Sequence, residues 1–189
     1  ITAEGFHTCV VDMKGQPRCW GGTGWGAETV PDNLVGVVAI DAGDQYTCAI
    51  DRAGETVCWG GNPTGQTDPP LDLINALVVQ AGTSHTCAMD VNRDVKCWGS
   101  NDYGLSDVPS SLLRPRMVSL ATNNICIINE TAEAQCWGEN FNGQASVPPN
   151  LGEVVSISTG PSYTCASSSE GAPHCWGAAG GGYFSAGDP

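Results

Sequence analysis

Basic residues are scarce in this sequence. Lys and Arg number 7 against 20 Asp and Glu, so the formal net charge is −13 and the isoelectric point is about 4.2. A surface that binds the phosphates of nucleic acid needs a basic stripe. The composition therefore argues against nucleic acid as a partner.

Long hydrophobic runs and helical periodicity are also missing. The apolar runs, such as Val35–Ile40, are far shorter than the ~18 residues of a membrane helix, so we expect no membrane insertion. No segment keeps a helical period over ten residues, whereas short runs of β-forming residues alternate with turn residues. The predicted fold class is all-β.

The ten cysteines show one spacing throughout. The two members of each pair are 10 residues apart, and successive pairs are 39 residues apart. A constant period of this length indicates one supersecondary unit copied five times, as in solenoids and propellers. We place the repeats at approximately 1–39, 40–78, 79–117, 118–156 and 157–189, within a single domain 1–189.

Each cysteine pair flanks a predicted hairpin turn. In the third repeat, Cys87 and Cys97 lie equally far from Asn92, at the centre of the turn. Residues opposed in an antiparallel ladder are ~4.5–5.5 Å apart, which suits a disulfide. Buried reduced thiols are the less favoured alternative, because an even, paired count is typical of an oxidising compartment. The predicted bridges are Cys9–Cys19, Cys48–Cys58, Cys87–Cys97, Cys126–Cys136 and Cys165–Cys175.

A Trp-Gly dipeptide follows the second cysteine of each pair. The five tryptophans are Trp20, Trp59, Trp98, Trp137 and Trp176. They could form a set of ligand platforms, but identical large aromatics in register more often fill the seam between stacked repeats. We favour the packing role, and Trp25, outside this series, is freer to bind a ligand.

The repeat resembles a known family. The pattern A-G-x-x-H-T-C-A over Ala81–Ala88, with C-W-G-x-N-x-x-G-Q over Cys58–Gln66, resembles the repeat of the regulator of chromosome condensation superfamily. It is also similar to the propeller-type β-lactamase inhibitor protein, and the cysteine-bearing version is similar to the extracellular repeats of the Crinkly receptor kinases. The resemblance implies a β-propeller. Members of the family usually have seven blades, whereas this sequence holds five repeats, each with one predicted disulfide. We expect a five-bladed propeller, and a part of a larger propeller or an assembly of several chains stays open.

The sequence does not predict an enzyme. It contains no Ser elbow, HExxH, phosphate loop or dinucleotide fingerprint. The absence of CxxC and EF-hand spacing predicts no metal site and no cofactor. His7 and His85 occupy one repeat position that the other copies fill with Tyr46, Asn124 and Tyr163, so this position does not behave as a catalytic base.

Binding is expected on loops where the copies differ. The loop before each first cysteine varies most, and the β-lactamase inhibitor uses the matching face to bind its enzyme. The candidate binding residues of this first set are Phe6, His7, Asp44, Gln45, Tyr46, Ser84, His85, Asn123, Asn124, Ser162 and Tyr163. A second set near the Gly-rich links comprises Trp25, Tyr103, Phe141, Tyr183 and Phe184.

Two functions compete on these features. The first is a secreted, non-catalytic module for protein recognition or extracellular assembly, at the cell surface or in a periplasm. The second is a multivalent lectin, which should repeat one aromatic and polar set in every blade. The asymmetric loops favour a protein over a glycan partner, and self-association stays open. Asn129, in the sequon Asn129–Thr131 on a predicted hairpin turn, is a candidate for glycosylation.

Overall fold

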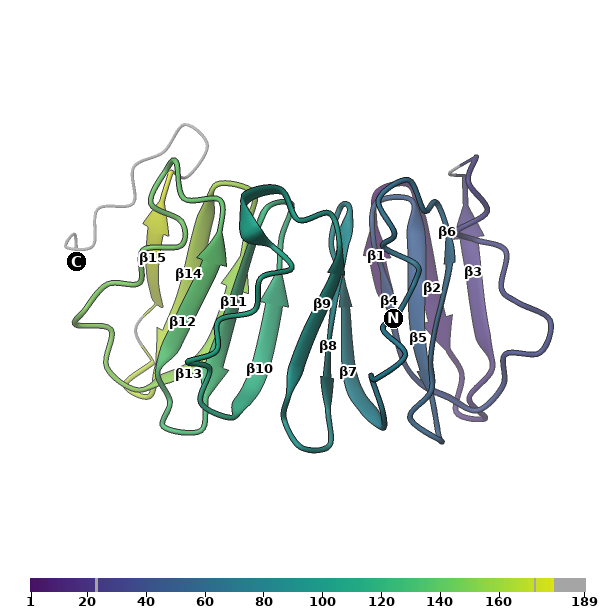
Figure 1. The fold of residues 1–189 in the computed structure, drawn as a ribbon, viewed down its shortest axis with the longest axis horizontal. Coiled ribbons are helices and arrows are strands. Elements are labelled where there is room, and N and C mark those ends of the chain that lie inside the picture. The colour runs from purple at the N-terminus through teal and green to yellow at the C-terminus, as the bar shows by residue number, and fades with distance from the viewer. Residues whose placement is uncertain (23, 172, 179–189) are drawn as a thin grey trace. The chain divides into compact units, whose positions relative to one another are not determined.

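The computed structural model of the chain describes residues 1–22, 24–171 and 173–178. Each repeat forms one three-stranded antiparallel sheet, and the only helix among these residues is a single 3-10 turn, η1 (Asp102–Gly104) (Figure 1). The chain divides into two compact units, Ile1–Asn101 and Asp102–Pro189. The single domain over 1–189 stays a prediction.

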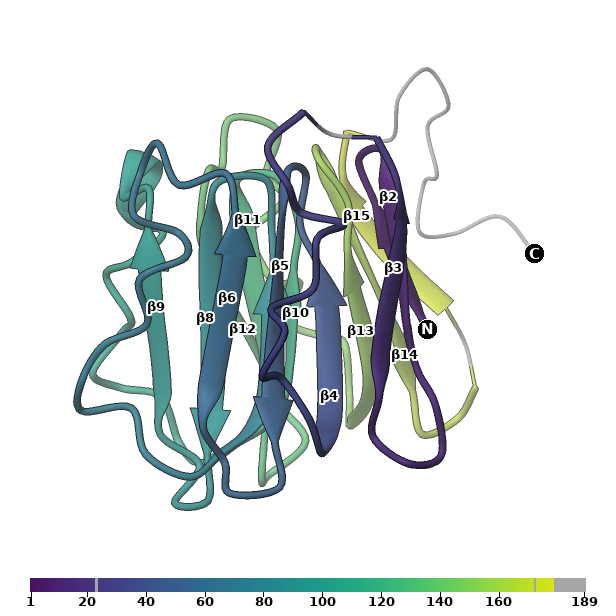
Figure 2. The ribbon, with the colours of Figure 1, turned by 90° about the vertical axis from the view of Figure 1, so that its right-hand side faces the viewer.

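The first unit holds three sheets whose strands follow chain order. The strands are β1 (Thr2–Glu4), β2 (His7–Val11), β3 (Pro17–Gly21), β4 (Val37–Ala42), β5 (Tyr46–Asp51), β6 (Thr56–Gly60), β7 (Ala76–Ala81), β8 (His85–Asp90) and β9 (Val95–Gly99). Figure 2 shows β4, β5 and β6 of the second sheet next to one another. Neighbouring sheets of this unit pack against each other, since β4 contacts β1 and β2, and β7 contacts β4 and β5.

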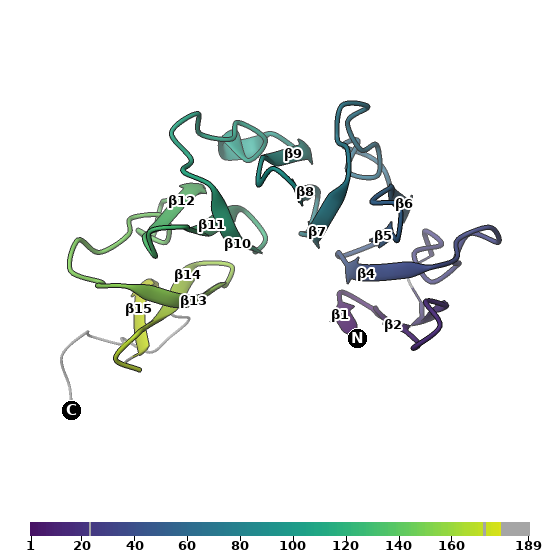
Figure 3. The ribbon, with the colours of Figure 1, turned by 90° about the horizontal axis from the view of Figure 1, so that it is seen from below.

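The second unit repeats this arrangement with two sheets. The first strand of its later sheet packs on the first two strands of its earlier one (Figure 3). The strands are β10 (Pro115–Leu120), β11 (Asn124–Asn129), β12 (Ala134–Gly138), β13 (Val154–Thr159), β14 (Tyr163–Ser168) and β15 (Pro173–Gly177).

The hairpin between the second and third strands explains the cysteine spacing. Paired cysteines are directly opposed in the ladder, as Cys87 is to Cys97, and their Cα atoms are 4.0–4.1 Å apart. All five predicted disulfides are confirmed. The turn is closed by an acidic side chain: Asp90 Oδ1 accepts hydrogen bonds from the backbone N–H groups of Asn92 (2.8 Å) and Asp94 (3.0 Å).

The apolar core lies between neighbouring sheets of a unit. Between the first two sheets, buried Leu34, Val37, Ala49 and Trp59 form one cluster, with Val11 packed against it. The second strands are buried on both faces, as in β5, whose first five residues are all buried. Part of this burial comes from the next sheet, since β5 contacts β7, so each repeat depends on its neighbour for its core.

The tryptophans after the second cysteines complete these seams. The indole Nε1–H of Trp59 donates to the carbonyl of Ala27 (2.8 Å), and that of Trp98 donates to the carbonyl of Gln66 (2.9 Å). Trp137 and Trp176 make the same bond one and two repeats later, and this confirms the predicted packing role. Trp20 is 52% exposed and makes no such bond among the described residues.

Candidate binding surface

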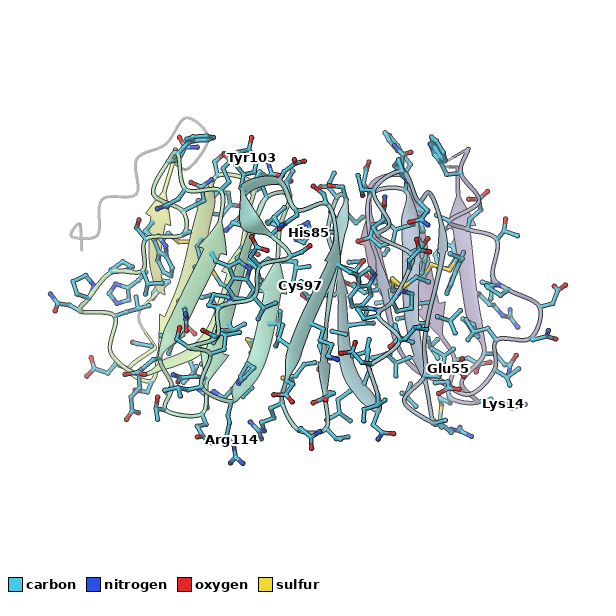
Figure 4. All side chains as sticks on the ribbon, viewed as in Figure 1. Lys14, Glu55, His85, Cys97, Tyr103 and Arg114 are labelled. Carbon is cyan, nitrogen blue, oxygen red and sulfur yellow. A yellow bond between two sulfur atoms is a disulfide. The ribbon has the colours of Figure 1, made fainter. Side chains whose placement is uncertain are left out.

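Both predicted loop sets lie at one end of each unit. We call this the loop end; it carries the turns between first and second strands and the links that follow the third strands. Backbone hydrogen bonds join the two sets, from Gly61 N to Gln45 O (2.8 Å) in the first unit and from Glu139 N to Asn123 O (2.7 Å) in the second. The opposite, hairpin end carries the turns between second and third strands. Figure 4 shows Tyr103 at the loop end and Arg114 at the hairpin end of the second unit.

The glycine after each tryptophan allows this contact. Gly60 has a φ of 104°, and a Cβ there would lie 2.8 Å from the carbonyl oxygen of Gln45. Gly138 is similar, with a φ of 100° and 2.5 Å from a built Cβ to the oxygen of Asn123. Only glycine fits such a close approach with a positive φ. In the Trp-Gly dipeptide, the tryptophan therefore packs between neighbouring repeats, and the glycine allows the close backbone contact at the loop end.

The position shared by His7, Tyr46, His85 and Asn124 is buried, and this corrects the prediction that these four side chains line an exposed face. Three of them, His7, Tyr46 and Asn124, bond to the following repeat instead. His7 Nε2 lies 2.8 Å from Thr47 Oγ1, and the Tyr46 hydroxyl donates to the carbonyl of His85 (2.6 Å). Burial raises the pKa of Tyr46, which keeps the phenol a donor.

His85 differs from its counterparts. Both of its ring nitrogens are buried without a hydrogen-bond partner among the described residues, and burial lowers its pKa to about 4. Its counterpart His7 instead bonds to Thr47 of the next repeat (2.8 Å).

The other predicted residues are accessible to different degrees. Phe6 is exposed, whereas Asp44, Gln45, Ser84, Asn123 and Ser162 are half-buried, and Tyr163 is 38% exposed. Trp25, Tyr103 and Phe141 of the second set are exposed. Tyr183 and Phe184 lie outside the described residues.

The sequon asparagine is not the accessible side chain that we expected. Asn129 is only 7% exposed. Asn129 closes its hairpin turn in the same way as Asp90 closes the turn of the preceding repeat. Its Oδ1 accepts hydrogen bonds from the backbone N–H groups of Thr131 (3.0 Å) and Glu133 (2.8 Å). Its amide donates to the Glu133 carboxylate (3.0 Å). Glycosylation at Asn129 stays a prediction, and it would require this turn to open.

The hairpin end holds a surface that sequence reasoning missed. A hollow of about 320 Å³ lies in the first unit, lined among others by Val38, Arg52, Leu77 and Val91. Val38 and Leu77 each sit at a break in the strand register, between Val37 and Ala39 and between Ala76 and Val78. A β-bulge turns such a side chain outward. Single-sequence patterns do not reveal these bulges, because the residues read as ordinary strand positions.

Comparison with protein families identifies the repeat. Residues 37–66 and 78–105 match the family described as regulator of chromosome condensation (RCC1) repeat. The sheets that these stretches form are built like the three others, with the same cysteine and tryptophan positions. Two of the five repeats are therefore of the RCC1 type, and the other three share their cysteine and tryptophan positions.

Solved structures with this fold include receptor ectodomains. The ectodomain of the Physcomitrella patens receptor kinase CR4 is 22% identical with a TM-score of 0.73, and the match covers 93% of this chain and 49% of that one. The CRINKLY WD40 ectodomain of the Arabidopsis thaliana receptor kinase ACR4 is 20% identical with a TM-score of 0.73, and the match covers 96% of this chain and 70% of that one. Prp20p of Saccharomyces cerevisiae is 18% identical with a TM-score of 0.76, and the match covers 93% of this chain and 56% of that one. These matches confirm the all-β, propeller-type fold.

The curated proteins and the helix content add two negative findings. The search of curated proteins found no significant match. In the part of the chain that the structure describes, no helix has the length and apolar character needed to cross a membrane. The chain spans about half the length of the CR4 ectodomain and of Prp20p.

Proposed function

We propose that this protein is a non-catalytic module that works outside the cell and recognises a protein partner through its loop end. The observation that carries the proposal is the group of exposed aromatic side chains there, Phe6 and Trp25 in the first unit and Tyr103 and Phe141 in the second. Exposed aromatics at the rim of a rigid scaffold are typical of interaction hot spots.

The residues that recur in each repeat stabilise the fold. The cysteines form bridges, four of the five repeat tryptophans bond to the preceding link, and the position of His7 and Tyr46 joins adjacent repeats. These roles leave the differing loop residues as the part of the repeat that is available for a partner.

The extracellular setting is supported by two findings. Five disulfides and no free cysteine fit an oxidising compartment. Two of the similar structures are ectodomains of receptor kinases. A third similar structure, Prp20p, is that of a protein that binds Gsp1p and histones, and a protein partner for this chain is in line with that.

An array of purified extracellular proteins, with a glycan array beside it, tests the proposal. Phe6→Ala and Phe141→Ala change one exposed ring in each unit. Leu71→Ala and Leu113→Ala are the matched controls, because these side chains are exposed away from the loop end. We expect a protein ligand whose binding is weakened by the first pair only. Binding that depends on the control positions, or on a glycan alone, contradicts the proposal.

A further inference from the structure

The two ends of each unit differ in charge. The loop end has no Lys or Arg, since all seven basic residues lie in hairpin turns or near the hairpin-side starts of strands. Figure 4 shows Lys14 at the hairpin end of its unit and Arg114 at that of the other. The seven are Lys14, Arg18, Arg52, Arg93, Lys96, Arg114 and Arg116.

The loop end of the second unit carries an aromatic pair. The rings of Tyr103 and Phe141 stand edge to face, with centroids 5.6 Å apart and an interplanar angle of 88°. Tyr103 is 51% exposed and Phe141 is 80% exposed. The rings belong to the links of successive repeats, so the pair joins two loops into one surface feature.

The local backbone explains how Tyr103 reaches this place. In the sister links, Gln66 Oε1 accepts the backbone N–H of Thr64 (3.0 Å), and Gln144 Oε1 accepts that of Asn142 (2.9 Å). Leu105 replaces this glutamine in the third repeat and offers no acceptor. The link instead forms η1, with Tyr103 in the left-handed region at a φ of 60°, a conformation rare for a residue with a Cβ.

Carboxylates flank the pair. Asp102 adjoins Tyr103, and Asp107 lies one turn further, with its Oδ2 3.5 Å from a Cβ built on Gly104. Glu139, two residues before Phe141, is held by neutral groups, since its carboxylate accepts from the side-chain amides of Asn123 (2.7 Å) and Gln144 (3.2 Å). These hydrogen bonds order the carboxylate without a cation to balance it.

We infer that the Tyr103–Phe141 pair and its flanking carboxylates bind a Lys- or Arg-rich segment of a protein partner. This inference rests on the proposed function and adds the chemical class of the partner segment. A guanidinium or ammonium group is attracted to the face of an aromatic ring. The surrounding carboxylates add a negative potential that no basic side chain at this end opposes, and such complementarity raises the rate and selectivity of docking.

The experiment measures binding of fluorescein-labelled octa-arginine by fluorescence anisotropy, with octa-glutamate as the charge control. Tyr103→Gly suits the positive φ of this position, and Phe141→Ala truncates an exposed ring. We expect each to weaken octa-arginine binding about two- to fivefold, the range of an exposed cation–π contact. Asp102→Asn should also weaken it.

Matched controls separate this site from the overall negative charge. Leu113→Ala removes an exposed apolar side chain, and Glu153→Gln removes an exposed charge, both at the hairpin end of the same unit. We expect neither to change octa-arginine binding by as much as twofold. Thermal unfolding followed by circular dichroism checks that all variants are folded.

The outcomes distinguish this inference from the proposed function. If Phe141→Ala and Leu113→Ala bind octa-arginine equally well, or if the unmodified protein does not bind it, the inference of a Lys- or Arg-rich partner segment is wrong. The proposed function then still holds if the array yields a loop-dependent protein ligand that is not basic. A glycan whose binding needs Tyr103 and Phe141, without octa-arginine binding, overturns both in favour of the lectin.

Discussion

Replacement of a seam tryptophan tests how the repeats are joined. The carbonyl of Gln66 accepts two hydrogen bonds, from Trp98 Nε1 (2.9 Å) and from Thr86 Oγ1 (2.9 Å). Trp98→Phe removes one of them and leaves a small cavity beside a buried ring. We expect the free energy of unfolding to fall by ~2–3 kcal/mol, of which ~1 kcal/mol is the hydrogen bond and the rest is lost packing.

Trp20→Phe is the control, because Trp20 has the same repeat position but is exposed. It should change the free energy of unfolding by ~0.5 kcal/mol or less. Urea denaturation followed by far-ultraviolet circular dichroism measures both variants without relying on indole fluorescence. If Trp20→Phe costs as much as Trp98→Phe, burial against the preceding link is not what makes these tryptophans stabilising.

A double-mutant cycle isolates the shared carbonyl. Thr86→Val leaves the indole bond to Gln66 in place, whereas Trp98→Phe with Thr86→Val leaves this buried carbonyl without either donor. A buried acceptor without a partner costs more than the loss of one of two bonds. The double variant should therefore lose ~1 kcal/mol more than the sum of the single variants. Additive losses would refute the two-donor account.

Three further predictions concern the bridges, the buried histidine and the hairpin turns. Changing Cys48 and Cys58 together to Ala should lower the free energy of unfolding by ~2–3 kcal/mol, because the bridge closes a loop of about ten residues; urea denaturation measures the loss, and an unchanged midpoint would contradict it. Since burial lowers the pKa of His85 from 6.5 to about 4, the unfolded chain binds more protons at this residue between these values; the contribution of His85 to the free energy of unfolding should therefore fall, by up to ~3 kcal/mol, as the pH drops from 6.5 to 4, whereas Glu4, whose pKa burial raises to about 7, acts in the opposite direction. His85→Asn should remove that fall in urea titrations at each pH. Asp90→Ala should cost ~1–2 kcal/mol by the same assay because two buried turn bonds are lost, whereas Asp90→Asn should cost less, as Asn129 already fills the equivalent turn.

The period of the sequence predicts most of the fold. Opposed cysteines require an antiparallel hairpin with its turn midway, and the structure has this hairpin five times. Tryptophan in constant register predicted a seam between repeats, and Trp59 and Trp98 lie in such seams. Features that recur in every copy are predictable because one local geometry must satisfy all five copies.

Contacts between repeats were less predictable. The shared position of His7, Tyr46 and Asn124 varies in side chain and precedes a cysteine, which resembles a surface loop in a single sequence. Its function depends on a hydroxyl about 40 residues later, as in the bond from His7 to Thr47 and that from Asn124 to Thr164. Neither residue alone indicates the pair. The available signal was the threonine that recurs directly after this position, at Thr47, Thr86 and Thr164, whatever residue precedes it.

Only part of the proposed binding surface could be predicted from the sequence, for a similar reason. Aromatic residues near the links were identified, but the pairing of Tyr103 with Phe141 depends on a leucine at position 105, which removes the acceptor that fixes the sister links. A substitution that releases one link from the common geometry is neutral for the fold if the turn still closes, as it does here from Leu105 N to Asp102 O (3.3 Å). The replacement is tolerated because position 105 is fully buried, where an apolar side chain needs no hydrogen-bond partner. The exposed residues of the link are then free to differ between copies and to serve a partner.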